Sequence, residues 1–196
     1  AGQICISLQR LLIHKDIMDK FLSEFIPLVT NLKVGDPIDE STDVGPLINE
    51  EAAIKAEEWI NEAVKNGAKL ITGGKRKGSV VSPAILTDVE RTMRIVCFEA
   101  FAPVVSVIPY NTIEEAIDIV NDSEYGLQAG IFTKDINIAF KAIKGIKVGG
   151  IMINDTSLYR ADMMPYGGVK NSGIGREGPR YAIEEMTDLK TVVINL

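Results

Sequence analysis

A cysteine lies close to the beginning of the chain, in the stretch AGQICISLQR. Cysteine can act as a nucleophile when backbone N–H groups or a nearby base stabilise its thiolate. Cys5 follows Gly2 and Gln3, which are not typical core residues, and precedes an apolar run at 11–13. Three roles are therefore open for Cys5: an ordinary buried cysteine, one half of a disulfide, or a nucleophile whose supporting residues lie elsewhere.

Few other residues suit such chemistry. The second cysteine, Cys97, lies between apolar neighbours just before a predicted buried strand, which favours an inert thiol. A cofactor-free cysteine hydrolase would have to pair Cys5 with the single histidine, His14, which ends the strand-like LLIH. One histidine and two cysteines predict no metal site. Two cysteines without a repeating spacing predict no disulfide framework, so we expect a reducing compartment and a cytoplasmic protein.

Composition narrows the class of protein further. Of the 196 residues, 46% are hydrophobic and 24% are charged, which is ordinary for a globular domain with a real core. The formal net charge of −6 disfavours nucleic acid as a partner. No apolar run approaches the roughly 18 residues of a membrane span, and no secretory signal opens the chain. We therefore expect neither nucleic acid nor a membrane as a partner.

The elements that must position these residues alternate between helices and strands. Hydrophobic periodicity and capping residues predict helices at residues 15–32, 49–66, 112–121, 136–144 and 179–186. Strands are predicted at residues 68–74, 101–110, 126–133, 148–154 and 189–196. Strands that alternate with helices of about ten residues indicate βαβ units. We therefore predict an α/β fold with a mostly parallel sheet and flanking helices.

Single residues predict details of these helices. Asp16 and Asp135 are expected to be N-caps, and Thr112 has capping-box spacing to Glu115. The second helix is expected to end at Gly67. Its buried side is expected to consist of Ala53, Ala56, Ile60 and Val64.

The last forty residues have a different character. Residues 155–180 form a long glycine-rich stretch, and a loop of that length in a compact domain is usually functional or disordered. The strand at 189–196 is apolar and has no helix after it, so its edge needs a cover. A neighbouring subunit is the simplest cover, and we expect a homo-oligomer, either a dimer or a tetramer. The chain then divides into a main domain at 1–186 and a C-terminal oligomerisation strand at 187–196.

The stretch GIGREG, at 173–178, matches the letters G-x-G-x-x-G. A dinucleotide-binding fingerprint follows a strand, opens a full helix and has an acidic residue about 20 positions further on. Here the preceding residues are the loop PYGGVKNS, and the chain ends near the place where the acid would stand. We therefore predict a loop that turns sharply several times, not a phosphate-binding turn.

Four motifs together give the chain a family resemblance. GQICIS at the start resembles the nucleophile motif of the aldehyde dehydrogenase superfamily, and FEAFAPVVSV (98–107) resembles its Glu-x-Phe-(Gly/Ala)-Pro motif. NDSEYGLQAGIFTKD (121–135) and IND…MPYGGVKNSGIGREG (153–178) resemble its two later motifs. The four occur in the family's order and cover essentially the whole chain. The chain looks closest to the lactaldehyde and succinate-semialdehyde dehydrogenase type members.

The resemblance implies a role for particular residues. It makes 1–186 a catalytic domain in which Cys5 attacks an aldehyde to form a thiohemiacetal, whose oxyanion is held partly by the backbone N–H of Cys5. A hydride then passes to NAD or NADP, and water hydrolyses the thioester. Glu99 matches the glutamate that binds the nicotinamide-side ribose hydroxyls, and Phe101 matches an aromatic residue at the same end of the cofactor.

The resemblance also marks residues for the aldehyde. Asn154, Tyr166 and Leu127 match positions near the aldehyde funnel or its supporting loops. Arg160 is a separate hypothesis, because a guanidinium in this loop suits a carboxylate or hydroxyl on the aldehyde. Ile4 offers no charge beside the nucleophile, which argues against a phosphorylated substrate.

Members of the family are more than twice as long as this chain. Their dinucleotide-binding domain, general-base glutamate and oxyanion-hole asparagine match nothing here, so we expect the catalytic portion of a longer enzyme, inactive by itself. The residue that selects NAD or NADP and the identity of the aldehyde are not predicted. Two alternatives stay open, namely the Cys5/His14 hydrolase and a non-catalytic fragment used for assembly.

Overall fold

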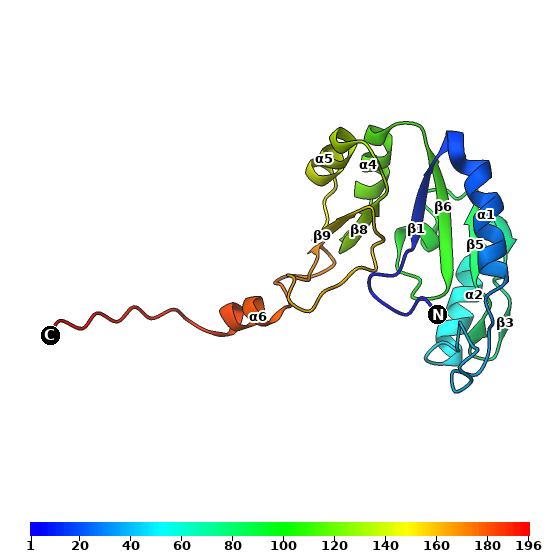
Figure 1. The fold of residues 1–196 in the computed structure, drawn as a ribbon. Helices are drawn as coiled ribbons and strands as arrows, with labels where there is room; N and C mark the ends of the chain where they lie inside the picture. Colours follow the sequence, from blue (N-terminus) through cyan, green and yellow to red (C-terminus); the bar gives the residue numbers. More distant parts are fainter. The chain divides into compact units, whose positions relative to one another are not determined.

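The computed structural model describes all residues from Ala1 to Leu196, and they form two compact units. The first unit is Ala1–Val120 and the second is Asn121–Leu196. Figure 1 labels helices and strands of both units.

A four-stranded sheet forms the centre of the first unit. Its strands lie in the order β1 (Arg10–His14), β6 (Val104–Tyr110), β5 (Ala84–Thr87) and β2 (Lys69–Thr72). β6 runs parallel to both β1 and β5, whereas the edge strand β2 is antiparallel to β5. The prediction of a mostly parallel sheet is confirmed, and β6 is its buried central strand.

Helices cover both faces of this sheet. They are η1 (Lys15–Ile17), α1 (Met18–Thr30), α2 (Glu50–Lys65), α3 (Arg94–Cys97) and α4 (Ile113–Asn121). Along β6, Val105 and Val107 pack with the apolar side of α1, and Val104 and Ile108 pack in the cluster that contains the buried face of α2. Successive strand residues point to opposite faces, so the apolar run of β6 fits a strand that is covered on both sides. A short hairpin of β3 (Arg76–Lys77) and β4 (Val80–Val81) completes the unit.

Two predicted details of these helices are wrong. Asp16 does not cap a helix with its side chain, because a 3-10 turn capped by His14 precedes α1. In α2 the buried side includes Ala63 instead of Val64, which is 41% exposed. Ala63 stands three positions after Ile60, on the same helix face, and its side chain is buried in the same core cluster. Gly67 follows α2 with a φ of +109°, as predicted for the residue that ends it.

The second unit contains one parallel strand pair with its crossover helix. β8 (Gln128–Ile131) pairs in parallel with β9 (Gly150–Ile153), and α5 (Ile136–Gly145) connects them. Asp135 caps α5 as predicted, since its carboxylate accepts hydrogen bonds from two backbone N–H groups of the first turn. β7 (Tyr125–Gly126) pairs antiparallel with β10 (Val169–Lys170), and α6 (Pro179–Met186) follows the glycine-rich loop.

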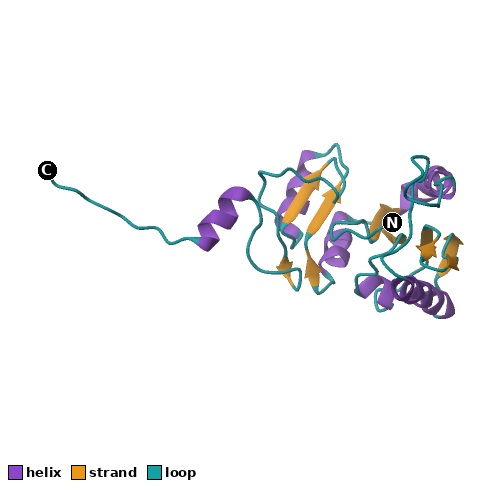
Figure 2. Cartoon of the chain, turned by 90° about the horizontal axis from the view of Figure 1, so that it is seen from below, coloured by secondary structure: helices purple, strands orange, loops and turns teal.

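Residues 187–196 have no assigned secondary structure in the single chain. Figure 2 draws them as loop from the end of α6 to the C-terminus. Their large apolar side chains are exposed, at Leu189, Val192, Val193, Ile194 and Leu196. A strand requires a partner strand for its hydrogen bonds, so the predicted oligomerisation strand stays a prediction. None of the helices has the length and apolar character that crossing a membrane requires.

Candidate active site

Cys5 lies on an exposed turn just before β1. The turn is closed by the hydrogen bond from Ser7 N to Ile4 O, at 2.9 Å, and Cys5 is its second residue. Ile6 is 5% exposed and anchors the turn to the core, whereas the side chain of Cys5 is exposed. Cys5 and Cys97 form no disulfide. Of the three roles open for Cys5, the buried cysteine and the half-disulfide are therefore wrong.

Two residues before Cys5 hold this turn in place. Gly2 has a φ of +72°, and a Cβ at Gly2 would lie 2.1 Å from Ala102 O, so only glycine permits the approach. Gln3 Oε1 accepts a hydrogen bond from Ile48 N at 2.8 Å, and Gln3 Nε2 donates to Pro46 O at 3.4 Å. The segment that carries Cys5 is thereby fixed to two loops that are distant in sequence.

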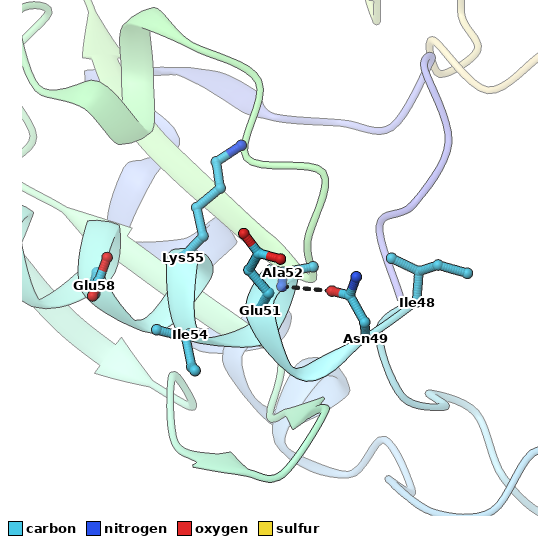
Figure 3. A pocket seen from close by; sticks show the side chains of 7 residues that line it. All are labelled: Ile48, Asn49, Glu51, Ala52, Ile54, Lys55 and Glu58. Atoms are coloured by element: carbon cyan, nitrogen blue, oxygen red, sulfur yellow. Dashed lines mark hydrogen bonds between the residues drawn. The ribbon is translucent and has the colours of Figure 1, made fainter.

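The residue that Gln3 binds, Ile48, lies just before the start of α2. Ile48 directly precedes Asn49, whose Oδ1 accepts a hydrogen bond from Ala52 N at 2.8 Å and caps the helix, as Figure 3 shows. A shallow pocket on the outer face of this helix is lined by Ile48, Asn49, Glu51, Ala52, Ile54, Lys55 and Glu58. It contains none of the predicted site residues. Sequence reasoning missed the role of Gln3, because its partners lie more than 40 positions away.

Glu99 and Phe101 lie on the segment that Gly2 contacts. The Glu99 carboxylate is exposed and makes no hydrogen bond or ion pair with the chain. Phe101 is 41% exposed and has a φ of +53°, a backbone region that is unfavourable for an aromatic residue. Phe101 is therefore not a core residue. Backbone strain of this kind persists where the surroundings enforce it, and it is enriched at functional sites.

Cys97 and His14 form hydrogen bonds with backbone groups away from Cys5. Cys97 Sγ donates a hydrogen bond to Arg91 O at 2.7 Å, which is consistent with an inert thiol. His14 Nε2 lies 2.8 Å from Asn111 O, and His14 Nδ1 accepts a hydrogen bond from Asp16 N at 3.3 Å. Both ring nitrogens are thus engaged next to the C-terminal end of β1, while Cys5 precedes the other end. The Cys5/His14 hydrolase has no available base, and this alternative is wrong.

The acidic, histidine and cysteine residues gather nowhere in a group of three or more that could hold a metal ion.

In the second unit, Asn154 joins the ends of β8 and β9. Its backbone N–H donates to Ile131 O at 2.7 Å, and its Oδ1 accepts a hydrogen bond from Thr133 N at 2.8 Å. Its φ of +58° turns the chain out of β9 into the long loop. Asparagine tolerates this conformation better than most residues, so Asn154 sets where the loop begins.

Arg160 and Tyr166 lie together in that loop. The guanidinium carbon of Arg160 is 4.1 Å from the centroid of the Tyr166 ring, within the range of a cation–π contact. Arg160 also forms an ion pair with Glu177, at 3.0 Å between Nη2 and Oε2. Tyr166 is 7% exposed and pairs through its backbone with Glu177. The structure therefore brings two of the three predicted substrate residues into direct contact.

The remaining motif residues of the second unit bind one another, and we call them the clasp (residues 121–126 with 167–172). Lys170 Nζ donates to Asn121 O and to Ser123 O, each at 2.8 Å. Ser172 Oγ accepts a hydrogen bond from Gly126 N at 2.9 Å. These polar groups are satisfied within the chain, so the clasp holds the unit together.

GIGREG is a loop, as predicted. Gly173, Gly175 and Gly178 all have a positive φ, and the stretch follows the loop after β10. Arg176 N donates to Glu185 Oε1 at 2.9 Å, which ties the loop to α6. A carboxylate at this place disfavours a bound phosphate.

Comparison with known proteins identifies a family and individual relatives that the chain resembles. Residues 1–192 match the model of the aldehyde dehydrogenase family. The 3-sulfolactaldehyde dehydrogenase of Priestia aryabhattai is 51% identical over 196 residues, which are 100% of this chain and 41% of that protein. The lactaldehyde dehydrogenase of Methanocaldococcus jannaschii is 48% identical over 195 residues, which are 100% of this chain and 42% of that protein.

A solved structure agrees with these relatives. The glyceraldehyde-3-phosphate dehydrogenase GapN of Methanocaldococcus jannaschii, complexed with NADP, has a TM-score of 0.95 and 48% sequence identity. The match covers 99% of this chain and 42% of that chain. This chain therefore spans about two fifths of the length of the relatives that it matches. The match over its own length is nearly complete, and the chain belongs to the aldehyde dehydrogenase family.

Proposed function

We propose that this chain carries the catalytic portion of an NAD(P)-dependent aldehyde dehydrogenase, with Cys5 as its nucleophile. The observation that carries the proposal is the placement of Cys5. It is exposed on a turn that Gly2 and Gln3 fix from one side and buried Ile6 fixes from the other. A nucleophile needs both access to the substrate and a defined position.

In the proposed reaction the Cys5 thiolate attacks the aldehyde carbon. A carbon–sulfur bond forms, and the carbonyl oxygen becomes an oxyanion, to which the backbone N–H of Cys5 donates a hydrogen bond. When bound, NAD(P) would supply the acceptor for the hydride that leaves this carbon, and the carbon then forms a thioester with Cys5. Water then attacks the thioester, which breaks the carbon–sulfur bond and releases a carboxylate, a proton and the Cys5 thiol. No residue of this chain is assigned as the base for that water.

Glu99 and Phe101 are the residues proposed to hold the nicotinamide end of the cofactor. The Glu99 carboxylate is exposed and has no partner within the chain, so both of its oxygens are available to two ribose hydroxyls. The exposed ring of Phe101 offers a flat apolar surface beside it. Gly2 brings the nucleophile segment against this same stretch. The residues present therefore fit a nicotinamide cofactor, and the choice between NAD and NADP is left to the experiment below.

For the substrate we propose a short 2-hydroxyaldehyde, with or without an anionic group. Two relatives are named for lactaldehyde and for sulfolactaldehyde. Arg160 offers a guanidinium for an anionic or hydroxyl group, and its contacts with Tyr166 and Glu177 hold it in one orientation. Asn154 directs the loop that carries them.

The test is formation of NAD(P)H by the enzyme that carries this sequence. A panel of lactaldehyde, sulfolactaldehyde and glyceraldehyde 3-phosphate, each with NAD and with NADP, identifies the substrate and cofactor. Cys5→Ser is expected to lower kcat by about a thousandfold or more, and the matched variant Cys97→Ser should keep kcat within about twofold because Cys97 takes no part in the chemistry. Undiminished turnover by Cys5→Ser would refute the proposal.

We also propose that residues 187–196 form a strand on a second copy of the chain, in a dimer or tetramer. The support is a run of exposed apolar side chains with high β propensity, from Val192 to Ile194. Val193→Lys should then lower the mass of the oligomer in sedimentation velocity, whereas Lys190→Gln should not. An unchanged mass for Val193→Lys would contradict the proposed strand. We place the protein in the cytoplasm, since a catalytic thiolate must stay reduced.

A further inference from the structure

Gln128, in β8, contacts the loop that carries Arg160. Gln128 Nε2 donates hydrogen bonds to Ser157 O at 2.9 Å and to Tyr159 O at 3.0 Å. A carboxamide nitrogen has two hydrogens, so one side chain uses both of them on two carbonyls of the same loop. The second carbonyl belongs to the residue directly before Arg160.

The backbone around Gln128 is built for this contact. Gln128 pairs with Gly150 of β9, where a Cβ would lie 3.4 Å from Gln128 Cγ. Two residues further along the same face of β8, a Cβ at Gly130 would lie 2.3 Å from Asp155 O. The first residues of the loop therefore lie directly against β8. Gln128 donates hydrogen bonds to the carbonyls that follow them, those of Ser157 and Tyr159.

Two further hydrogen bonds near these carbonyls are local. Leu158 N donates to Thr156 Oγ1 and Tyr159 N donates to Thr156 O, each at 3.3 Å. Such bonds shape the loop but do not fix it to the strands. Gln128 supplies that link on one side of Arg160, and the ion pair with Glu177 supplies another.

The carboxamide of Gln128 makes hydrogen bonds through its nitrogen but not through its oxygen. Gln128 Oε1 is buried and has no hydrogen-bond partner. A buried acceptor without a partner is destabilising, and methionine would fill the same space without it. The retained penalty is offset by the two bonds to the loop.

We propose that Gln128 is a positioning residue that sets the conformation of the loop at 155–160 and, through Arg160, the selectivity of the enzyme for anionic aldehydes. The selectivity rests on the proposed function, whereas the positioning of the loop does not. A methionine keeps the volume of Gln128 and removes both donors. A glutamate keeps the shape and turns a carboxylate toward two carbonyl oxygens, which is repulsive.

The first arm of the test is amide hydrogen exchange of the whole chain. Gln128→Met is expected to speed the exchange of residues 156–161 by about tenfold, because local opening becomes easier, and Gln128→Glu should speed it further. Ser123→Ala is the matched control, since it also removes a side-chain hydrogen bond to the backbone of this unit, from Tyr125 N. Unchanged exchange in both Gln128 variants overturns the positioning role.

The second arm measures kcat and KM in the enzyme that carries this sequence, with one anionic and one neutral aldehyde of equal length. Gln128→Met should raise KM for the anionic aldehyde by about tenfold and change kcat for the neutral one by less than about twofold. Faster exchange with an unchanged ratio of kcat/KM between the two aldehydes overturns the selectivity role. Absence of aldehyde oxidation in the unmodified enzyme refutes the proposed function instead, while the exchange arm still decides whether Gln128 positions the loop.

Discussion

The motif residues around Cys5 and Glu99 in the first unit and the clasp of the second unit use their polar groups differently. In the first unit, Cys5 and Glu99 are exposed, and the Glu99 carboxylate has no partner. In the clasp, the side chains of Lys170 and Ser172 form hydrogen bonds with the backbone of residues 121–126. Glu99, whose carboxylate stays available, is therefore a candidate for ligand binding, whereas Lys170 and Ser172, whose polar atoms the chain already satisfies, are candidates for structure.

Substitutions at two glycines test this difference between the two regions most strongly, because each glycine permits a close backbone approach. A Cβ at Gly149 would lie 1.6 Å from Gly167 O in the clasp, and one at Gly2 would lie 2.1 Å from Ala102 O. Gly149→Ala is expected to lower the free energy of unfolding by about 3 kcal/mol. Gly2→Ala should lower it by about 1 kcal/mol, since Gly2 lies in an irregular, partly exposed segment that can shift more easily than the clasp.

Gly2→Ala and Gly149→Ala should also differ in their effect on the reactivity of the Cys5 thiol. Gly2→Ala is expected to change the rate at which iodoacetamide alkylates Cys5, because the turn loses its anchor. Gly149→Ala should leave the alkylation rate of the folded protein unchanged. Urea denaturation and intact-mass kinetics measure the two effects, and equal effects of both variants on both quantities would remove the distinction between the regions.

Glu99 tests whether an open carboxylate serves a ligand. Glu99→Gln is expected to raise KM for the nicotinamide cofactor by about tenfold, since an amide accepts hydrogen bonds more weakly than a carboxylate. The thermal stability of Glu99→Gln should stay unchanged because the carboxylate makes no hydrogen bond or ion pair within the chain. Steady-state kinetics and thermal unfolding check both parts, and a loss of stability with unaltered KM would place Glu99 with the structural residues.

Lys170 tests the opposite case. Lys170→Met removes two charge-assisted hydrogen bonds at an exposed position and should lower the free energy of unfolding by about 1 kcal/mol. Turnover per folded molecule is expected to stay near the unmodified value, because no ligand contact is lost. Urea titration monitored by circular dichroism gives the first quantity. A variant with full stability and lost turnover would show that Lys170 belongs to the chemistry.

Glu115 provides the smallest effect and the matched control for Glu99. Its carboxylate accepts hydrogen bonds from Asn111 N and Asn111 Nδ2, at 2.8 and 2.9 Å, which lower its pKa below the ordinary value. A lowered pKa in the folded state stabilises the fold above the unfolded pKa, and this stabilisation is lost as pH falls through the folded pKa. Glu115→Gln should therefore unfold less steeply with acid below about pH 4. A thermal-melt series against pH checks this, and KM for the cofactor should not change.

Much of the fold follows from local patterns. The alternation of helices and strands, the cap at Asp135, the helix end at Gly67 and the short helix after Pro179 are all set by neighbours in sequence, and each is confirmed. Two of the errors came from longer-range packing. Val64 has the right period for the core, but Ala63 is the buried residue. His14 has suitable chemistry for a base, but its ring nitrogens are taken by Asn111 and Asp16.

The sequence by itself determined the family motifs, the α/β order and the choice of Cys5 as the candidate nucleophile, because these depend on residue type and short spacing. Only the tertiary structure decided which polar atoms remain available. Gln3 meets Ile48, and Gln128 meets Tyr159, through hydrogen bonds between segments far apart in the chain. No local pattern encodes such a pairing, since it arises only when the strands and helices have packed.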